Sequence, residues 1–186
     1  MDRESLIMEK YIDNIVRKIV EVAKKENNEL MKIADNNLNS ELGIFHMSEL
    51  AFAYMCGKKI MQDSHNIFGD NIPKWSRELK LDNGGLSDLV FEFNDESKIV
   101  IEFKMRDTVD AYIRDVEKLS ELQDKKIVKL FCAVIDTMKK DLPFDDRVKK
   151  INSNPKTKTL YCDSFKTNQT WYKSEVYALI GVWKIN

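Results

Sequence analysis

The stretch that most constrains this chain is a pair of short apolar runs separated by a polar break. The runs are Leu86 to Phe93 and Ile99 to Phe103, and Asn94 to Ser97 lies between them. Both runs are rich in β-branched and aromatic residues, which are typical of strands, and the break is typical of a turn. The stretch from residue 86 to residue 104 therefore predicts a β-hairpin.

Each predicted strand has one apolar face and one face on which charge lies among apolar residues. Side chains alternate between the two faces of a strand, so Glu102 and Lys104 point away from Phe103, and Asp88 points away from Leu89. When the apolar faces are matched, Asp88, Glu102 and Lys104 lie on one patch. Two carboxylates and an ammonium on a half-buried sheet are costly unless they are paired or bind a metal. This cost indicates a functional site.

The patch can form only if the two strands of the hairpin pair in a particular register. Asp88 shares a face with Glu102 and Lys104 only if even-numbered residues of one strand lie opposite even-numbered residues of the other. A regular four-residue loop would place Phe93 opposite Lys98 and turn Asp88 to the wrong side. We therefore expect a three- or five-residue loop, or a bulge.

Asp88, a hairpin and then Glu102-Phe103-Lys104 at the end of an apolar strand resemble the metal site of the PD-(D/E)xK nuclease superfamily. Ser87 stands where the motif has Pro in many members. The resemblance covers about residues 41 to 136. It implies an α/β (α+β) fold with a restriction endonuclease-like core, in which helices flank a mixed β-sheet. It also implies that Asp88 and Glu102 bind Mg²⁺, with the Phe103 carbonyl as a further oxygen, and that Lys104 positions or activates the attacking water.

Residues 46 to 57 are expected to form a helix that ends near Gly57. Glu49, Ala53 and Cys56 share one face of it. The resemblance makes Glu49 a fourth member of the site, as a helical acid that binds the metal. The alternative is a first-turn Glu that the helix dipole favours.

Residues 3 to 35 have apolar residues at helical spacing, so a long N-terminal helix is expected, with Asn27-Asn28 as a point where it could break. Its apolar stripe could pack on the rest of the chain or form a homodimer interface. The remaining expectations are a loop over Lys58–Lys74, a strand over Trp75–Leu81 with a tight turn at Asp82–Gly85, a helix capped by Asp107 or Thr108 that runs to about Asp124, an interior strand over Ile127–Ile135, and further elements over 137–186.

The segment from residue 139 to residue 158 is rich in basic side chains. The chain carries 30 Lys and Arg against 31 Asp and Glu, so binding to a nucleic acid must use a local patch. A second group of basic residues that could lie near a bound phosphate is Arg106, Arg114 and Lys118. The alternative for this group and for the segment from residue 139 to residue 158 is a solvated surface without a ligand. The residues expected to contact a phosphate backbone are Lys139, Lys140, Arg147, Lys149 and Lys150.

Composition narrows the class of protein further. Three cysteines without metal-ligand spacing and only two histidines argue against a zinc site. The chain shows neither a membrane-spanning apolar stretch nor a signal peptide, so we expect a cytoplasmic protein with no membrane partner.

These observations lead to one expected function and one alternative. We expect a single nuclease-like domain over 1–186, with an N-terminal helical extension (1–40), a core (41–136) and C-terminal elements (137–186). It would hydrolyse DNA with Mg²⁺, which Mn²⁺ could replace, and RNA stays open as a substrate. The alternative is a catalytically weak protein of the same fold that binds nucleic acid or acts as a regulatory dimer. The presence of Asp88, Glu102 and Lys104 together favours the enzyme.

Overall fold

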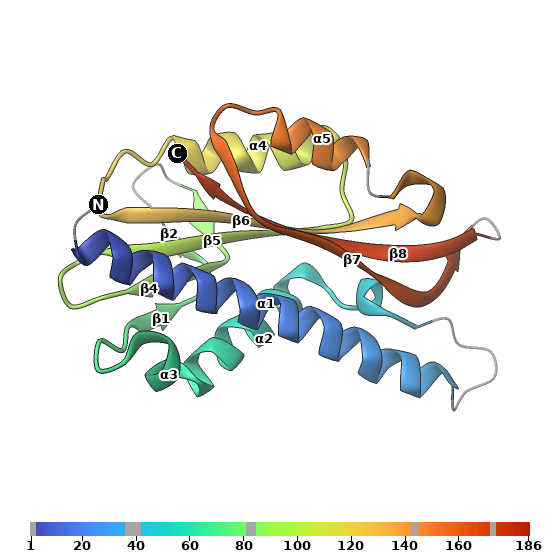
Figure 1. Ribbon diagram of the computed structural model, residues 1–186, viewed down its shortest axis with the longest axis horizontal. Coiled ribbons are helices and arrows are strands. Elements are labelled where there is room, and N and C mark those ends of the chain that lie inside the picture. Colours follow the sequence, from blue (N-terminus) through green and yellow to red (C-terminus); the bar gives the residue numbers. More distant parts are fainter. Residues whose placement is uncertain (1–2, 36–41, 81–84, 143–144, 172–173) are drawn as a thin grey trace.

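A six-stranded mixed β-sheet lies between two layers of helices in the computed structural model (Figure 1). The structure describes residues 3–35, 42–80, 85–142, 145–171 and 174–186. The strand order is β1-β4-β5-β6-β8-β7, and β2 and β3 form a separate two-stranded sheet. The strands are β1 (Lys74–Ser76), β2 (Leu79–Lys80), β3 (Leu86–Ser87), β4 (Leu89–Glu92), β5 (Lys98–Met105), β6 (Ile127–Met138), β7 (Thr157–Trp171) and β8 (Ser174–Ile185).

The helices cover both faces of the large sheet. One layer contains α1, α2 and α3, and the opposite layer contains α4 and α5 (Figure 1). The helices are α1 (Arg3–Asp35), α2 (Glu49–Gln62), α3 (Ser64–Phe68), α4 (Val109–Ser120) and α5 (Asp146–Asn152), with short 3-10 turns η1 (Ile44–His46) and η2 (Lys139–Asp141). The expected mixed α/β fold with flanking helices is therefore confirmed at this level.

Strand β6 occupies the interior of the sheet, as its nearly continuous apolar sequence predicts. It runs parallel to β5 and antiparallel to β8. A parallel pair needs a crossover connection, and α4 supplies it between β5 and β6. Because β5 and β6 run parallel and Phe103 lies opposite Cys132, the residues that follow Phe103 lie beside those that follow Cys132.

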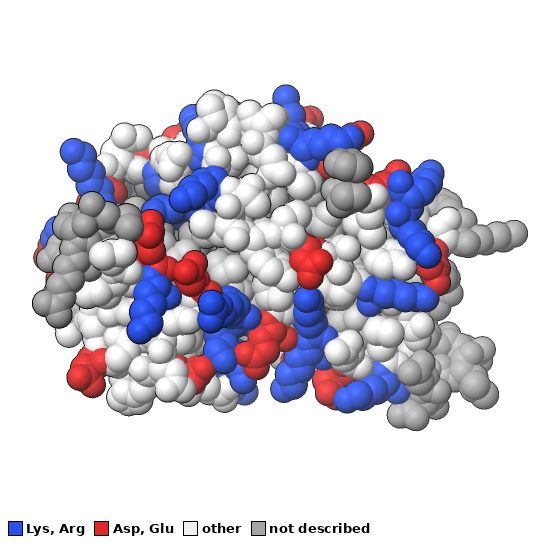
Figure 2. Space-filling view, viewed as in Figure 1, with Lys and Arg blue, Asp and Glu red and all other residues white. Residues whose placement is uncertain are grey.

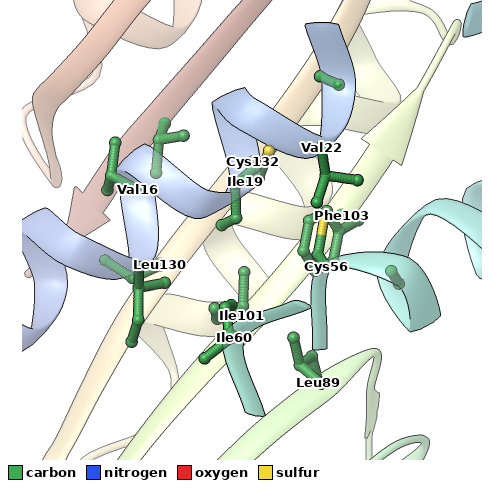
Figure 3. Close-up of a cluster of buried hydrophobic side chains, with 14 of the residues drawn as sticks. Val16, Ile19, Val22, Cys56, Ile60, Leu89, Ile101, Phe103, Leu130 and Cys132 are labelled. Atoms are coloured by element: carbon green, nitrogen blue, oxygen red, sulfur yellow. The ribbon is translucent and has the colours of Figure 1, made fainter. Parts of the chain in front are cut away.

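The larger core lies between the sheet and the layer of α1 and α2. Figure 3 shows Val16, Ile19 and Val22 of α1, Cys56 and Ile60 of α2, and Phe103 and Cys132 of the sheet as parts of one buried cluster. Burial raises the pKa of the Cys56 thiol, so this cysteine is an apolar core residue. Cys162 is exposed, in contrast to the other two thiols. Among the described residues, no helix is long and apolar enough to cross a membrane.

Helix α1 is continuous through the position at which a break was considered. Asn27 is only 2% exposed. Its side-chain amide donates to the Lys166 carbonyl at 3.0 Å, and its side-chain oxygen accepts from the Ile44 N–H at 3.1 Å. Asn27 therefore connects α1 to β7 and η1 instead of ending the helix.

Helix α2 differs from its expected end. Ser48 caps it by accepting from the Ala51 N–H, but the helix continues past Gly57 to Gln62. Gly57 serves a close approach here, because a Cβ at this position would lie 2.4 Å from Cζ3 of Trp75. The following segment, expected to be a loop, contains α3.

The expected strand over Trp75–Leu81 is divided into β1 and β2. Glu78, between them, has a φ of 51°, which interrupts the extended backbone. Strand β1 pairs with β4, whereas β2 pairs with β3. The turn predicted at Asp82–Gly85 lies mostly outside the described residues.

The C-terminal elements are a short helix and a long antiparallel hairpin of β7 and β8. Thr108 caps α4 as expected, by accepting from the Ala111 N–H, and α4 ends at Ser120 rather than near Asp124. The buried Trp183 donates through its indole nitrogen to the side chain of Asn152 at 2.7 Å, which joins α5 to β8. Trp183 is therefore a core residue.

Gly57→Ala tests the close approach of α2 to the sheet. Alanine favours a helix by about 1 kcal/mol, but its methyl would clash with Trp75 and Leu89. We expect a net loss of about 1–2 kcal/mol in the free energy of unfolding, measured by urea denaturation. Lys58→Ala, at the exposed neighbouring position, is the control and should change stability by less than about 0.5 kcal/mol. A stabilised Gly57→Ala variant would contradict this packing.

Candidate functional site

The register of β4 and β5 is the one that the sequence predicts, with even-numbered residues of one strand opposite even-numbered residues of the other. Leu89 lies opposite Ile101, and Glu92 lies opposite Lys98. The Phe93 N–H donates to the Ser97 carbonyl at 2.9 Å, so the loop has three residues, and Glu96 adopts a left-handed φ of 68°. This is the three-residue hairpin built on a turn and a left-handed residue. The prediction of an odd loop length is confirmed.

Asp88 lies at a bend between β3 and β4. In a continued ladder Ser87 would lie opposite Phe103, but the β4–β5 pairing ends at Leu89. Oδ2 of Asp88 accepts instead from the Phe103 N–H at 2.8 Å. Burial raises the pKa of Asp88, and the bond from Phe103 opposes that effect. One carboxylate thus replaces a main-chain partner and is fixed beside β5.

Glu102 points from β5 toward α4 and is only 6% exposed. Its Oε1 accepts from Nζ of Lys118 at 2.7 Å, and its Oε2 is buried without a hydrogen-bond partner. Burial raises the pKa of Glu102 to about 7, and the charges of Asp88 and Asp115 add to this effect while Lys118 opposes it. An unpartnered buried oxygen is costly, which favours a ligand at this position.

Lys104 lies between two carboxylates. Its Nζ is 3.2 Å from Oδ2 of Asp115 and 3.5 Å from Oε1 of Glu49. Burial alone would lower the pKa of Lys104, but the negative charges of Asp115 and Glu49 outweigh burial and raise it. The ammonium therefore stays charged, as its expected role requires.

Glu49 is the first residue of α2 and reaches to the end of β5. Its Oε2 accepts from the Met105 N–H at 2.8 Å. Burial raises the pKa of Glu49, and the charge of Asp88 raises it further. Glu49 therefore joins the site through Lys104 and Met105, and does not point to open solvent on the far side of the sheet. A place for Glu49 in a metal shell stays a prediction.

Two residues of α4, Asp115 and Lys118, complete the cluster. Asp115 did not stand out in the sequence, and Lys118 was considered only as a residue near a phosphate or on a solvated face. Both lie next to the buried stripe of α4, three residues apart, and therefore on one side of the helix. A helix that packs on the charged face of β5 must place polar side chains there, and this signal could have identified them.

The candidate cluster has the chemistry that a hard divalent ion prefers. It contains four carboxylates, from Glu49, Asp88, Glu102 and Asp115, and two ammoniums. Oxygen ligands of this kind suit Mg²⁺, and Oε2 of Glu102 is a buried oxygen without a hydrogen-bond partner that a cation could bind. Within the described ranges, no group of three His, Cys, Asp or Glu side chains has the arrangement to hold a metal ion. The ring of Phe103 packs edge-on against that of Phe52, with 5.6 Å between the ring centroids. The role of the Phe103 carbonyl as a metal ligand stays a prediction.

The basic residues of the C-terminal segment have mixed positions. Arg147 bonds to Asp136 and Asp145 and is held in a largely buried ion-pair network. Lys149 pairs with Asp146 at 2.8 Å on the surface, and Lys139, Lys140 and Lys150 are exposed. Nε of Arg106 lies 3.8 Å from Oδ2 of Asp136. Figure 2 shows acidic and basic side chains interspersed on the face in view rather than separated.

Comparisons with protein-family models, with curated proteins and with solved structures find no significant match to this chain.

The pKa of Glu102 predicts how stability depends on pH. The folded protein holds a proton on Glu102 up to about pH 7, whereas the unfolded chain releases it near 4.5. The metal-free protein should therefore lose stability as pH rises through this window, by up to roughly 3 kcal/mol. Glu49 and Asp88 shift in the same direction.

Urea denaturation in EDTA between pH 5 and pH 8 measures this loss. Glu102→Gln should flatten the dependence, because the neutral side chain cannot titrate. Glu9→Gln, an exposed position on α1, is the control and should keep the wild-type slope. An unchanged slope in Glu102→Gln would show that Glu102 ionises normally.

Proposed function

We propose that this protein is a Mg²⁺-dependent nuclease that hydrolyses phosphodiester bonds of DNA. One observation carries the proposal: Asp88, Glu102 and Lys104 converge at one end of β5, and Oε2 of Glu102 is buried there without a partner. The sequence resemblance to the PD-(D/E)xK superfamily assigns these three residues to a metal site. When β2 and β3 of the small sheet are set aside, the elements follow as β1, β4, β5, α4 and β6, and this strand, strand, strand, helix, strand order supports the resemblance.

The carboxylates would hold the metal. Asp88 and Glu102 would be the primary ligands, Glu49 would bind directly or through a water, and the Phe103 carbonyl could add a further oxygen. A bound divalent cation would supply positive charge to the scissile phosphate and promote ionisation of the attacking water. Mn²⁺ could substitute, since it accepts the same oxygen ligands.

Lys104 would act on the reacting atoms. Its ammonium is held in place by Asp115 and Glu49, so it needs little reorganisation to face a phosphate. From this position it would orient the attacking water or stabilise the negative charge that develops in the transition state. Because Asp115 and Glu49 keep Lys104 protonated, it would act as a positive charge rather than as a base.

The alternative function is that of a protein of this fold that binds nucleic acid without cleaving it. The observation in its favour is that Glu102 and Lys104 already have partners of opposite charge within the chain. The two functions differ in their need for a metal, so metal binding and cleavage separate them.

Asp88→Asn and Lys104→Ala test the proposal together. Asp88→Asn removes an anionic ligand and should lose both Mg²⁺ binding and DNA cleavage. Lys104→Ala removes no ligand, so it should keep Mg²⁺ binding and lose about a hundredfold in rate, corresponding to about 3 kcal/mol of transition-state stabilisation. Calorimetric titration with Mg²⁺ or Mn²⁺ and plasmid cleavage are the measurements.

Matched controls make the result specific. Asp13→Asn and Lys126→Ala remove exposed charges away from the cluster and should leave binding and cleavage unchanged. If the wild type binds no divalent ion, or if Asp88→Asn cleaves at the wild-type rate, the nuclease proposal fails. The binding function would then take its place.

The exposed lysines of the C-terminal segment are proposed to contact the DNA backbone. Lys140→Ala combined with Lys150→Ala should weaken binding to all sequences alike and lower the slope of log affinity against log salt by about two. Fluorescence anisotropy in EDTA measures binding without cleavage. Lys10→Ala combined with Lys32→Ala, on the exposed side of α1, is the control pair. An unchanged slope in the Lys140 and Lys150 variant would exclude this contact.

A further inference from the structure

We propose that Lys118 is a built-in counter-ion at the metal position. In the metal-free protein Lys118 holds the carboxylate of Glu102, and a divalent cation displaces it from that carboxylate. The inference rests on the proposed metal site and assigns a role to a residue that the sequence motif does not include.

The contacts of Lys118 are those of a group at a binding position. Its Nζ lies 2.7 Å from Oε1 of Glu102 and 2.6 Å from the Leu86 carbonyl. Leu86 lies two residues before Asp88 in the chain, and Glu102 would lie opposite Asp88 if the β4–β5 ladder continued. The ammonium therefore donates to two residues close to the proposed primary ligand, and its charge acts on Asp88 as well.

The second oxygen of Glu102 shows that Lys118 satisfies this carboxylate only in part. Oε2 is buried and has no hydrogen-bond partner, although Oε1 of the same side chain lies 2.7 Å from Nζ of Lys118. A carboxylate that served only to attach α4 to the sheet would be expected to have both oxygens bonded. One oxygen bonded to the Lys118 ammonium and one oxygen without a partner are what we expect of a carboxylate that can also bind a metal ion.

The charges of the cluster balance when a divalent ion enters. Four carboxylates and two ammoniums leave a formal charge of −2 when all are ionised, and one divalent cation brings the sum to zero. Lys118 can leave Glu102 without unfolding α4, because its charge is at the end of a flexible four-carbon chain. Its second acceptor is the carbonyl of Leu86, whose side chain is exposed, so solvent lies close to the ammonium.

Lys118→Met separates this role from a structural one. Removal of the positive charge should strengthen Mg²⁺ binding by about tenfold, because the ion no longer competes with Lys118 for Glu102. The titration is calorimetric, at pH 8.5, where the carboxylates are ionised. Lys118→Arg restores the charge and should return the affinity to within about threefold of the wild type.

Lys126 is a matched control. Its Nζ also bonds to one glutamate, Glu96, and one backbone carbonyl, that of Asp95, but on the β4–β5 loop. Lys126→Met should leave Mg²⁺ affinity unchanged. A general effect of charge on metal binding would strengthen both variants alike and would overturn the proposal.

A measurement on the wild type avoids any folding defect of the variants. With lysines labelled at Cε and Nζ, the NMR signal of the Lys118 ammonium should shift on saturation with Mg²⁺, and that of Lys126 should not. An unchanged Lys118 signal at saturation, or unchanged or weaker Mg²⁺ binding by folded Lys118→Met, overturns the inference while the metal site itself stands. Absence of Mg²⁺ binding by the wild type would instead remove the proposed function on which the inference rests.

Discussion

The pairing of β4 with β5 is the constraint on which the rest of the site depends. Leu89 opposite Ile101 turns the odd-numbered side chains of both strands into the core beneath α1 and α2. The even-numbered side chains of β5, including Glu102 and Lys104, then face α4. A slip of one residue would move Glu102 into the apolar core, so the three-residue loop and the burial of the odd face specify the same register.

Burial of charge on the α4 side explains the partners that surround it. An unpaired ion in a protein interior costs several kcal/mol, so each charge that β5 places there needs an opposite charge from a packed element. Asp115 and Lys118 supply these charges from α4, and Glu49 supplies one from α2. Asp88 is satisfied differently, by the N–H that the end of the strand ladder leaves on Phe103. Among the fully buried side-chain atoms of the described residues, Oε2 of Glu102 and Oδ2 of Asp115 have no hydrogen bond, and Oδ2 of Asp115 still lies 3.2 Å from Nζ of Lys104.

Local patterns predicted much of this structure, and the misses have physical reasons. Alternation and apolar runs identified the hairpin, the interior strand β6 and the capped helix α4. The extension of α2 past Gly57 depends on the approach of Trp75, and the division of β1 from β2 depends on the backbone of Glu78. Neither is visible in a local pattern. Arg147 looked like a contact for phosphate, but Asp136 and Asp145 hold it in ion pairs. The contribution of α4 to the site depends on the rotation of that helix against the sheet, which spacing alone does not define.

Anomalous diffraction from crystals that contain Mn²⁺ would locate the ion relative to named oxygens of the site. We expect a peak at roughly 2 Å from carboxylate oxygens of both Asp88 and Glu102, with Nζ of Lys118 moved away from Glu102. Saturating Mn²⁺ with no peak at these carboxylates, and with the Lys118–Glu102 ion pair intact, would contradict this expectation.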